Sequence, residues 1–167
     1  MRRLLAGLSI LLVLTVVHLE SYGFAFPGAV ALGYLAVGLA ALFCLATGAA
    51  RRRRRQVAWS ATILAAVAGS ALVANLVTAM QESASRARGD VIAAALTAWR
   101  EQGGRYPSEL NELVPEFLPE VPVSAMGVWR RVPFRYSRSV DRYDLRFHCL
   151  FFNECWRGPD GVWGRGD

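Results

Sequence analysis

Three apolar segments between Leu4 and Met80 constrain this chain more than any other feature, and the only dense charge among them is one arginine run. A helix that crosses the roughly 30 Å hydrocarbon core of a bilayer needs about 20 apolar residues at about 1.5 Å each. The second and third segments meet this length. The sequence therefore predicts a membrane protein with three transmembrane helices, over about 4–19, 24–50 and 57–80.

The first segment is short enough that the core of a cleaved signal peptide is an alternative interpretation. The peptide Gly23-Phe24-Ala25-Phe26 lacks the small-x-small pattern of a cleavage site, and it leads directly into the next apolar stretch. We therefore expect a retained span, followed by a tight hairpin through His18–Gly23.

Arginine placement predicts the orientation, because cytoplasmic loops near membrane spans collect positive charge. The run Arg51, Arg52, Arg53, Arg54 and Arg55 and the pair Arg2-Arg3 should both face the cytoplasm. We thus expect a bacterial inner-membrane protein with a cytoplasmic N-terminus and a periplasmic C-terminal domain. Binding of anionic lipid or nucleic acid is the alternative role for the run.

The formal net charge of +6 lies entirely in the first 80 residues, whereas arginines and acids balance after Gln81. A basic stretch confined to the membrane region favours the lipid bilayer as partner and argues against nucleic acid. Small residues such as those of Ala65-x-x-x-Gly69 permit close helix association, so the sequence is compatible with a homo-oligomer.

Residues 1–81 are expected to form the three-helix transmembrane region, and residues 82–167 an α+β domain. The stretch Gln81–Gln102 has helix-favouring composition, so we expect the third span to continue as one long helix into an amphipathic extension that ends at Gly103-Gly104 and packs on a small antiparallel sheet. Two runs with period-two alternation follow, joined by Ser137–Arg142, and Gly161–Trp163 is a candidate third strand. The apolar helix stripe comprises Val91, Ile92, Ala95, Leu96, Ala98 and Trp99, opposite Arg86, Asp90, Arg100 and Glu101. The apolar strand faces are Val132, Phe134 and Tyr136, and Tyr143, Leu145, Phe147 and Cys149.

An ordered set of residues in this half carries a family resemblance. The set comprises Gly104, Tyr106, Pro107, Trp129, Tyr136, Tyr143, Asp144 and Leu145. Placed after a membrane helix, it resembles the major pseudopilin of type II secretion and type IV pilin-like domains, over residues 57–147. The resemblance implies a long helix packed on a small antiparallel sheet.

The chain also departs from that family. Pilins have one span, which follows a leader cut between glycine and phenylalanine and carries a glutamate near the start of the mature chain. The segment Val57–Met80 has no Gly-Phe at its start and contains no acidic residue. We therefore expect the domain to stay fixed in the membrane. The calcium-binding aspartate of major pseudopilins has no equivalent at Ser124–Gly127, so no metal is expected.

Cys149 and Cys155 lie close together in the part of the chain expected outside the membrane, where an oxidising compartment favours a disulfide. A metal site that combines both thiols with His148 is the alternative. Cys44 lies within a predicted span and should pack as a small apolar residue.

No residue pattern indicates a catalytic site or a cofactor site, so we expect that the protein is not an enzyme. The preferred function is a membrane-fixed interaction or scaffold protein that docks on envelope machinery of the secretion or pilus type, with a membrane or envelope protein as partner. The alternative is a membrane-anchored sensory or ligand-binding module. Exposed tryptophans would favour that alternative, but Trp129, Trp156 and Trp163 are expected in the core.

Overall fold

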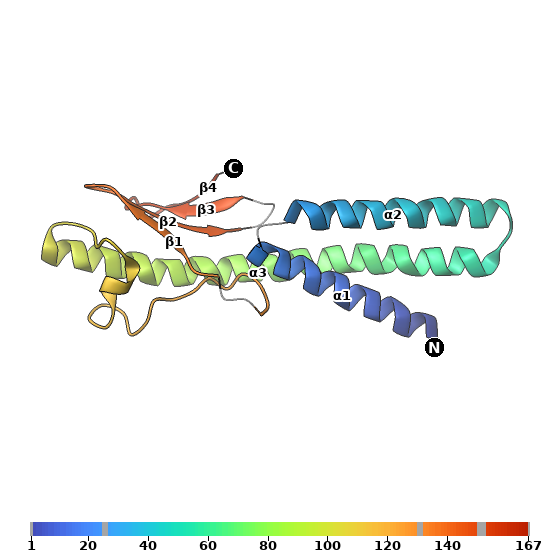
Figure 1. The fold of residues 1–167 in the computed structure, drawn as a ribbon, viewed down its shortest axis with the longest axis horizontal. Helices are drawn as coiled ribbons and strands as arrows, with labels where there is room; N and C mark the ends of the chain where they lie inside the picture. Colours follow the sequence, from blue (N-terminus) through green and yellow to red (C-terminus); the bar gives the residue numbers. More distant parts are fainter. Residues whose placement is uncertain (1, 25–26, 130–131, 150–152, 167) are drawn as a thin grey trace. The chain divides into compact units, whose positions relative to one another are not determined.

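The protein is described by a computed structural model that covers residues 2–24, 27–129, 132–149 and 153–166. The chain divides into two compact units, Met1–Val77 and Thr78–Asp167, which are described separately below. Its architecture is α+β, as the sequence predicts. The elements are α1 (Arg2–Phe24), α2 (Pro27–Ala50), α3 (Arg54–Gly103), the short 3-10 helix η1 (Leu110–Leu113), β1 (Arg135–Arg138), β2 (Tyr143–His148), β3 (Glu154–Arg157) and β4 (Trp163–Gly166) (Figure 1).

The described residues of the first unit are helical except for the short turn at 51–53. The expected hairpin at His18–Gly23 is wrong, because α1 continues through this segment to Phe24. The next helix begins at Pro27, a residue whose fixed φ and missing N–H suit the first helical turn. The expected span 24–50 therefore begins later than predicted, because Phe24 belongs to α1 and α2 begins at Pro27.

Two described helices are long and apolar enough to cross a membrane, with candidate segments Val30–Ala50 and Arg54–Gly103. The apolar part of α1, Leu5–Glu20, is shorter. The Tyr34 hydroxyl of α2 donates to the Leu14 carbonyl of α1 over 3.1 Å. A Cβ at Gly69 of α3 would lie 3.1 Å from the Leu11 side chain, so a small residue is needed where these two helices meet.

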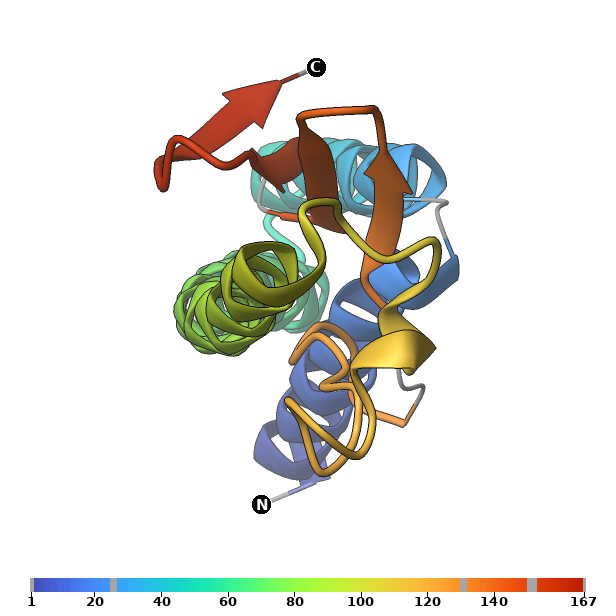
Figure 2. The same ribbon diagram turned by 90° about the vertical axis from the view of Figure 1, so that its left-hand side faces the viewer.

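The second unit contains a four-stranded antiparallel sheet in the order β1-β2-β3-β4 (Figure 2). Three of its strands differ from the sequence prediction. β1 is Arg135–Arg138, so it includes Ser137 and Arg138, which were expected in the hairpin loop. β3 was not predicted, and β4 begins at Trp163 and not at Gly161, whose φ of +80° suits the turn before the strand. The expected apolar face of the second run is confirmed, because its four residues are all buried: Tyr143, Leu145, Phe147 and Cys149.

The C-terminal half of α3 packs on this buried sheet face. Gly89 permits the contact, since a Cβ there would lie 2.6 Å from the Trp163 ring. Ile92 and Leu96 are fully buried one and two turns further on, as the apolar stripe predicts. The prediction that Val91 belongs to the packed stripe is wrong, because this residue is 52% exposed. The helix face toward the sheet is centred on Gly89, Ile92 and Leu96.

The long helix ends as predicted. Its last residue is Gly103, and Gly104 has a φ of +71°, a conformation that glycine adopts without a steric penalty. The Gly104 N–H donates to the Arg100 carbonyl over 2.7 Å, which satisfies one of the terminal carbonyl groups of the helix.

Candidate functional site

The predicted disulfide is present between Cys149, just after β2, and Cys155 in β3. Their Cα atoms are 5.7 Å apart, a normal separation for a bridged pair, and both residues are fully buried. The bond joins two neighbouring strands where the Cys149 N–H already donates to the Asn153 carbonyl over 2.9 Å. It therefore fixes the end of the central hairpin of the sheet.

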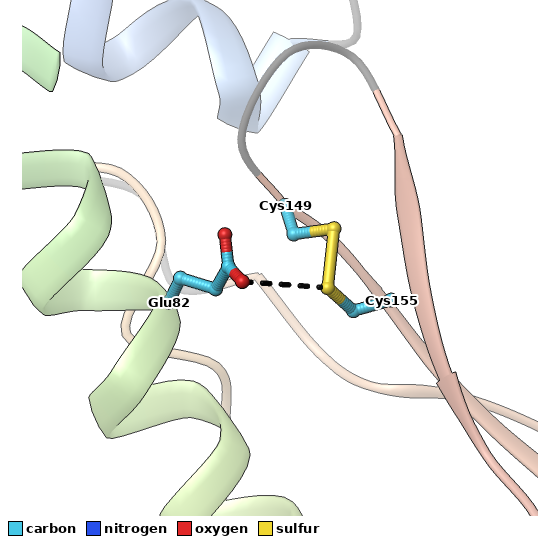
Figure 3. Close-up of side chains that lie close together, drawn as sticks. All are labelled: Glu82, Cys149 and Cys155. Atoms are coloured by element: carbon cyan, nitrogen blue, oxygen red, sulfur yellow. Dashed lines mark hydrogen bonds between the residues drawn. A yellow bond between two sulfur atoms is a disulfide. The ribbon is translucent and has the colours of Figure 1, made fainter. Parts of the chain in front are cut away.

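A buried carboxylate from α3 lies against this disulfide. Glu82 is only 7% exposed, and its Oε1 atom is 3.8 Å from the Sγ of Cys155 (dashed in Figure 3). A disulfide sulfur carries no proton, so this contact is a close approach and not a donated hydrogen bond. The charge on Glu82 is matched instead by two guanidinium groups, because Arg86 and Arg165 each donate to Oε1 over 2.7 Å.

This cluster ties α3 to the sheet within the second unit. Arg86 lies one turn after Glu82 on α3, while Arg165 comes from β4. A buried carboxylate stripped of such partners would cost several kcal/mol, on the order of 3–5 for a broken buried pair. The three charges and the disulfide thus fix helix and sheet at one point.

The same group is the only one in the described part of the chain that brings three potential metal ligands together: Glu82, Cys149 and Cys155 have ligand atoms within 4.8 Å of one another. Metals bind cysteine as thiolate, and both sulfurs are used in the disulfide. Two arginines also occupy the carboxylate oxygen. The expected alternative with His148 and two thiols does not fit this arrangement.

Most of the residues on which the sequence resemblance was based, here called the motif, gather at the C-terminal end of α3. The Tyr136 hydroxyl donates to the Pro107 carbonyl over 2.9 Å, and the Tyr106 and Tyr143 rings meet edge to face with centroids 5.0 Å apart. The Arg100 guanidinium lies over the Tyr106 ring at 5.1 Å. Gly104 turns the chain into this cluster, which therefore closes the end of the helix onto β1 and β2.

Burial in this cluster perturbs the tyrosines and does so without creating a reactive group. It raises the pKa of the Tyr136 hydroxyl to about 12, and burial also raises the pKa of Tyr143. Both phenols therefore stay protonated at neutral pH, and the Tyr136 hydroxyl acts as a hydrogen-bond donor. The motif residues Tyr106, Pro107, Tyr136, Tyr143 and Leu145 serve packing here.

Two members of the motif lie elsewhere. Asp144 is on the outer sheet face, where it accepts a 2.7 Å hydrogen bond from Arg146. Trp129 is 75% exposed, so its expected place in the core is wrong. Trp156, also expected in the core, is 37% exposed, and Trp163 is half-buried. Trp156 instead covers Gly164 of the neighbouring strand, where a Cβ would lie 2.3 Å from the ring.

The outer sheet face carries an ion-pair network around Trp156. Arg135 binds Glu154 over 2.7 Å, and Arg146 lies 3.6 Å from the same carboxylate. A groove of about 590 Å³ opens beside it, at the β1–β2 turn and the turn after β3. A second groove of about 690 Å³ runs along α3 and includes Val91, Met126 and Trp129 in its lining.

The arginine run forms a tight turn between α2 and α3. All five side chains are exposed, and Arg52 has a φ of 52° at the reversal. The Arg53 N–H donates to the Gly48 carbonyl, and the Gln56 side chain donates to the Cys44 carbonyl over 2.9 Å. Cys44 is unpaired, and it is exposed.

Sequence reasoning missed three features of the site. It did not single out Glu82 or Arg165, and it placed Asp90 on the solvent side of the helix. Asp90 in fact accepts hydrogen bonds from Arg157 at 2.5 Å and from the Trp163 indole at 2.8 Å. Only the unpredicted strand β3 would have brought Arg157 toward the helix, so no local signal marked these pairs.

Comparison of the chain with protein-family models, with curated proteins and with solved structures finds no match.

Proposed function

We propose that this chain is a membrane-fixed, pilin-like interaction or scaffold protein that docks on envelope machinery of the secretion or pilus type. One observation carries the proposal. α3 is a single helix of 50 residues whose N-terminal part is apolar over a membrane-length stretch and whose C-terminal part packs on a disulfide-linked antiparallel sheet. A membrane helix continued into such a unit is the arrangement of a pilin-like domain held at a membrane surface.

The three-span topology belongs to the same proposal. α1 has 23 residues but a shorter apolar part, and it acts as the first span of a helical hairpin with α2. The exposed arginine turn lies on the cytoplasmic side, and the second unit lies in the bacterial periplasm, where its disulfide is stable.

The orientation is tested with a matched pair of new cysteines in a Cys44→Ala background. Val140→Cys lies in the β1–β2 turn at a residue that is 82% exposed, and Arg51→Cys lies in the exposed arginine turn. A membrane-impermeant thiol reagent added to intact cells should label the first and not the second. The reverse pattern would overturn the orientation.

The docking role is tested by photo-crosslinking in cells. A photoreactive residue in place of Trp156 probes the outer sheet face, and the same residue in place of Val140 is the control at the sheet end. We expect adducts with inner-membrane components of a secretion or pilus assembly from position 156 and far fewer from position 140. Recovery of the chain alone, from both positions, would contradict the proposal.

A sensory or ligand-binding module is the second candidate, and the groove of about 590 Å³ beside Trp156 favours it. A half-exposed indole next to polar side chains suits a peptide or glycan. Titration with such ligands should then shift the emission of Trp156, and a Trp156→Phe variant should lose the shift.

A further inference from the structure

A loop of the second unit is fixed along α3 by a ladder of three hydrogen bonds. Arg88 donates to the Val123 carbonyl over 3.0 Å, Ser85 accepts from the Ala125 N–H over 2.9 Å, and Gln81 donates to the Gly127 carbonyl over 2.9 Å. As the loop advances from 123 to 127, its partners on the helix go back from 88 to 81. The loop therefore runs antiparallel to α3, toward the apolar stretch that ends at Met80.

Three exposed apolar side chains flank the last of these hydrogen bonds, between Gln81 and Gly127. Gly127, with a φ of +85°, turns the chain directly before Val128 and Trp129. Val128 is 47% exposed and Trp129 is 75% exposed, and Met80, next to Gln81 on the helix, is 73% exposed. Three large apolar side chains next to the residues joined by the Gln81–Gly127 hydrogen bond are thus exposed.

A second tryptophan stands at the other end of the same apolar stretch. Trp59 lies 22 positions before Gln81 in α3, which corresponds to about 33 Å at about 1.5 Å per residue. This separation matches a hydrocarbon core of about 30 Å with its boundaries. Tryptophans concentrate at both boundaries of a bilayer, because the ring is apolar and its N–H is polar.

We propose that Trp129, with Val128 and Met80, inserts into the interfacial layer of the lipid bilayer on the side of the second unit. Trp129 thereby fixes the depth of α3 from outside the helix, and Trp59 does so at the opposite boundary. The inference rests on the proposed membrane-fixed role and adds the lipid interface as the partner of this loop.

The test uses the full chain in phosphatidylcholine vesicles, with single-tryptophan variants in which the other four tryptophans are phenylalanine. Some vesicles carry bromine near the headgroup end of the acyl chains and others near the chain terminus. The variant that keeps Trp129 should lose most of its emission in the first vesicles and little in the second. The control keeps Trp163, whose ring packs at Gly89, about 12 Å further along α3, and should stay bright in both.

The variant that keeps Trp59 separates this inference from the proposed function. Quenching of Trp59 without quenching of Trp129 would leave the membrane helix intact and overturn the lipid contact of the loop. A blue-shifted Trp129 that no brominated lipid quenches would also overturn it, because the ring would then lie against protein, such as a second copy. If neither tryptophan is quenched, both proposals fail.

A pair of single substitutions guards against misfolding of the multiply substituted chains. Trp129→Phe in the otherwise unaltered protein should remove most of the emission that shallow bromine quenches. Trp156→Phe should lower the total emission and leave that quenched part unchanged. Equal quenching in the parent and in Trp129→Phe would contradict the proposal.

Discussion

The two halves of α3 use apolar residues in opposite ways. Before Thr78 the helix leaves some of its large side chains exposed: Leu72 is 63% exposed and Leu76 is 59% exposed. After Thr78 it buries Ile92 and Leu96 completely beneath the sheet. In this continuous helix, the second half is therefore covered by the sheet, whereas the first half contains leucines that the described part of the protein leaves exposed.

An apolar stripe does not by itself indicate a protein core. Burial of a leucine contributes about 1.5–3 kcal/mol wherever its water-exposed area is removed, whether by protein or by lipid. Under the proposed spanning role, lipid covers the exposed leucines of the first half. Substitutions in the two halves should then have different effects, and matched pairs along one helix can separate protein packing from lipid contact.

The largest effect on folding of the second unit is expected from Leu96→Ala. This side chain is fully buried, and its truncation leaves a cavity that typically costs about 2–5 kcal/mol. Leu76→Ala, the same change at an exposed position of the same helix, should cost less than about 0.5 kcal/mol. Urea unfolding in detergent, followed by the sheet signal in circular dichroism, compares the two. Equal losses would show that the halves are not distinct.

A charge should reverse this ranking when membrane insertion is measured. Leu72→Arg places a guanidinium in the apolar stretch, at a cost of about 2.5–3.5 kcal/mol near the centre of a span. Ala84→Arg is the control, because Ala84 is exposed in the second half. Carbonate extraction of membranes should release more of the first variant than of the second. Full retention of Leu72→Arg would contradict a spanning role for α3.

Loss of the disulfide should have an intermediate effect confined to the second unit. In the chain-entropy treatment, a loop as short as that between Cys149 and Cys155 contributes about 2 kcal/mol. The double variant Cys149→Ala and Cys155→Ala should lower the free energy of unfolding of the second unit by that amount, seen as a lower urea midpoint, and leave membrane insertion unchanged. Cys44→Ala is the control and should change neither quantity. A loss of insertion in the double variant would contradict the separation of the two halves.

The sequence predicted the elements of this fold that local patterns encode. Length and hydropathy indicated the apolar helices, Gly103-Gly104 indicated the end of α3, and period-two alternation from Tyr143 to Cys149 indicated β2 and its buried face. The disulfide followed from spacing and compartment. Each of these signals depends on neighbours in the chain.

The features that were missed depend on long-range contacts. β3 has four residues with Trp156 facing outward, which is too short for an alternation signal. Without β3 and β4 in place, nothing marked Asp90 as the partner of Arg157, or Glu82 as the partner of Arg165. Trp129 was assigned to the core because tryptophans in small domains are mostly buried. Its actual position depends on the hydrogen bonds between its loop and α3, which the sequence does not reveal.

The smallest effect, and the sharpest within the second half, is expected from Tyr136→Phe. The change removes the hydrogen bond to the Pro107 carbonyl and should cost about 1 kcal/mol at neutral pH. Burial raises the pKa of this phenol from the usual 10.0 to about 12, so the folded state disfavours the phenolate. Stability from Tyr136 should thus be full below about pH 10 and decline as the pH rises toward 12. When urea unfolding is measured between about pH 9 and 12, the free energy of unfolding should decline less steeply with pH in Tyr136→Phe than in the parent. An identical pH dependence in both would show that Tyr136 ionises freely in the folded protein, and that the tyrosine cluster does not shield the end of α3.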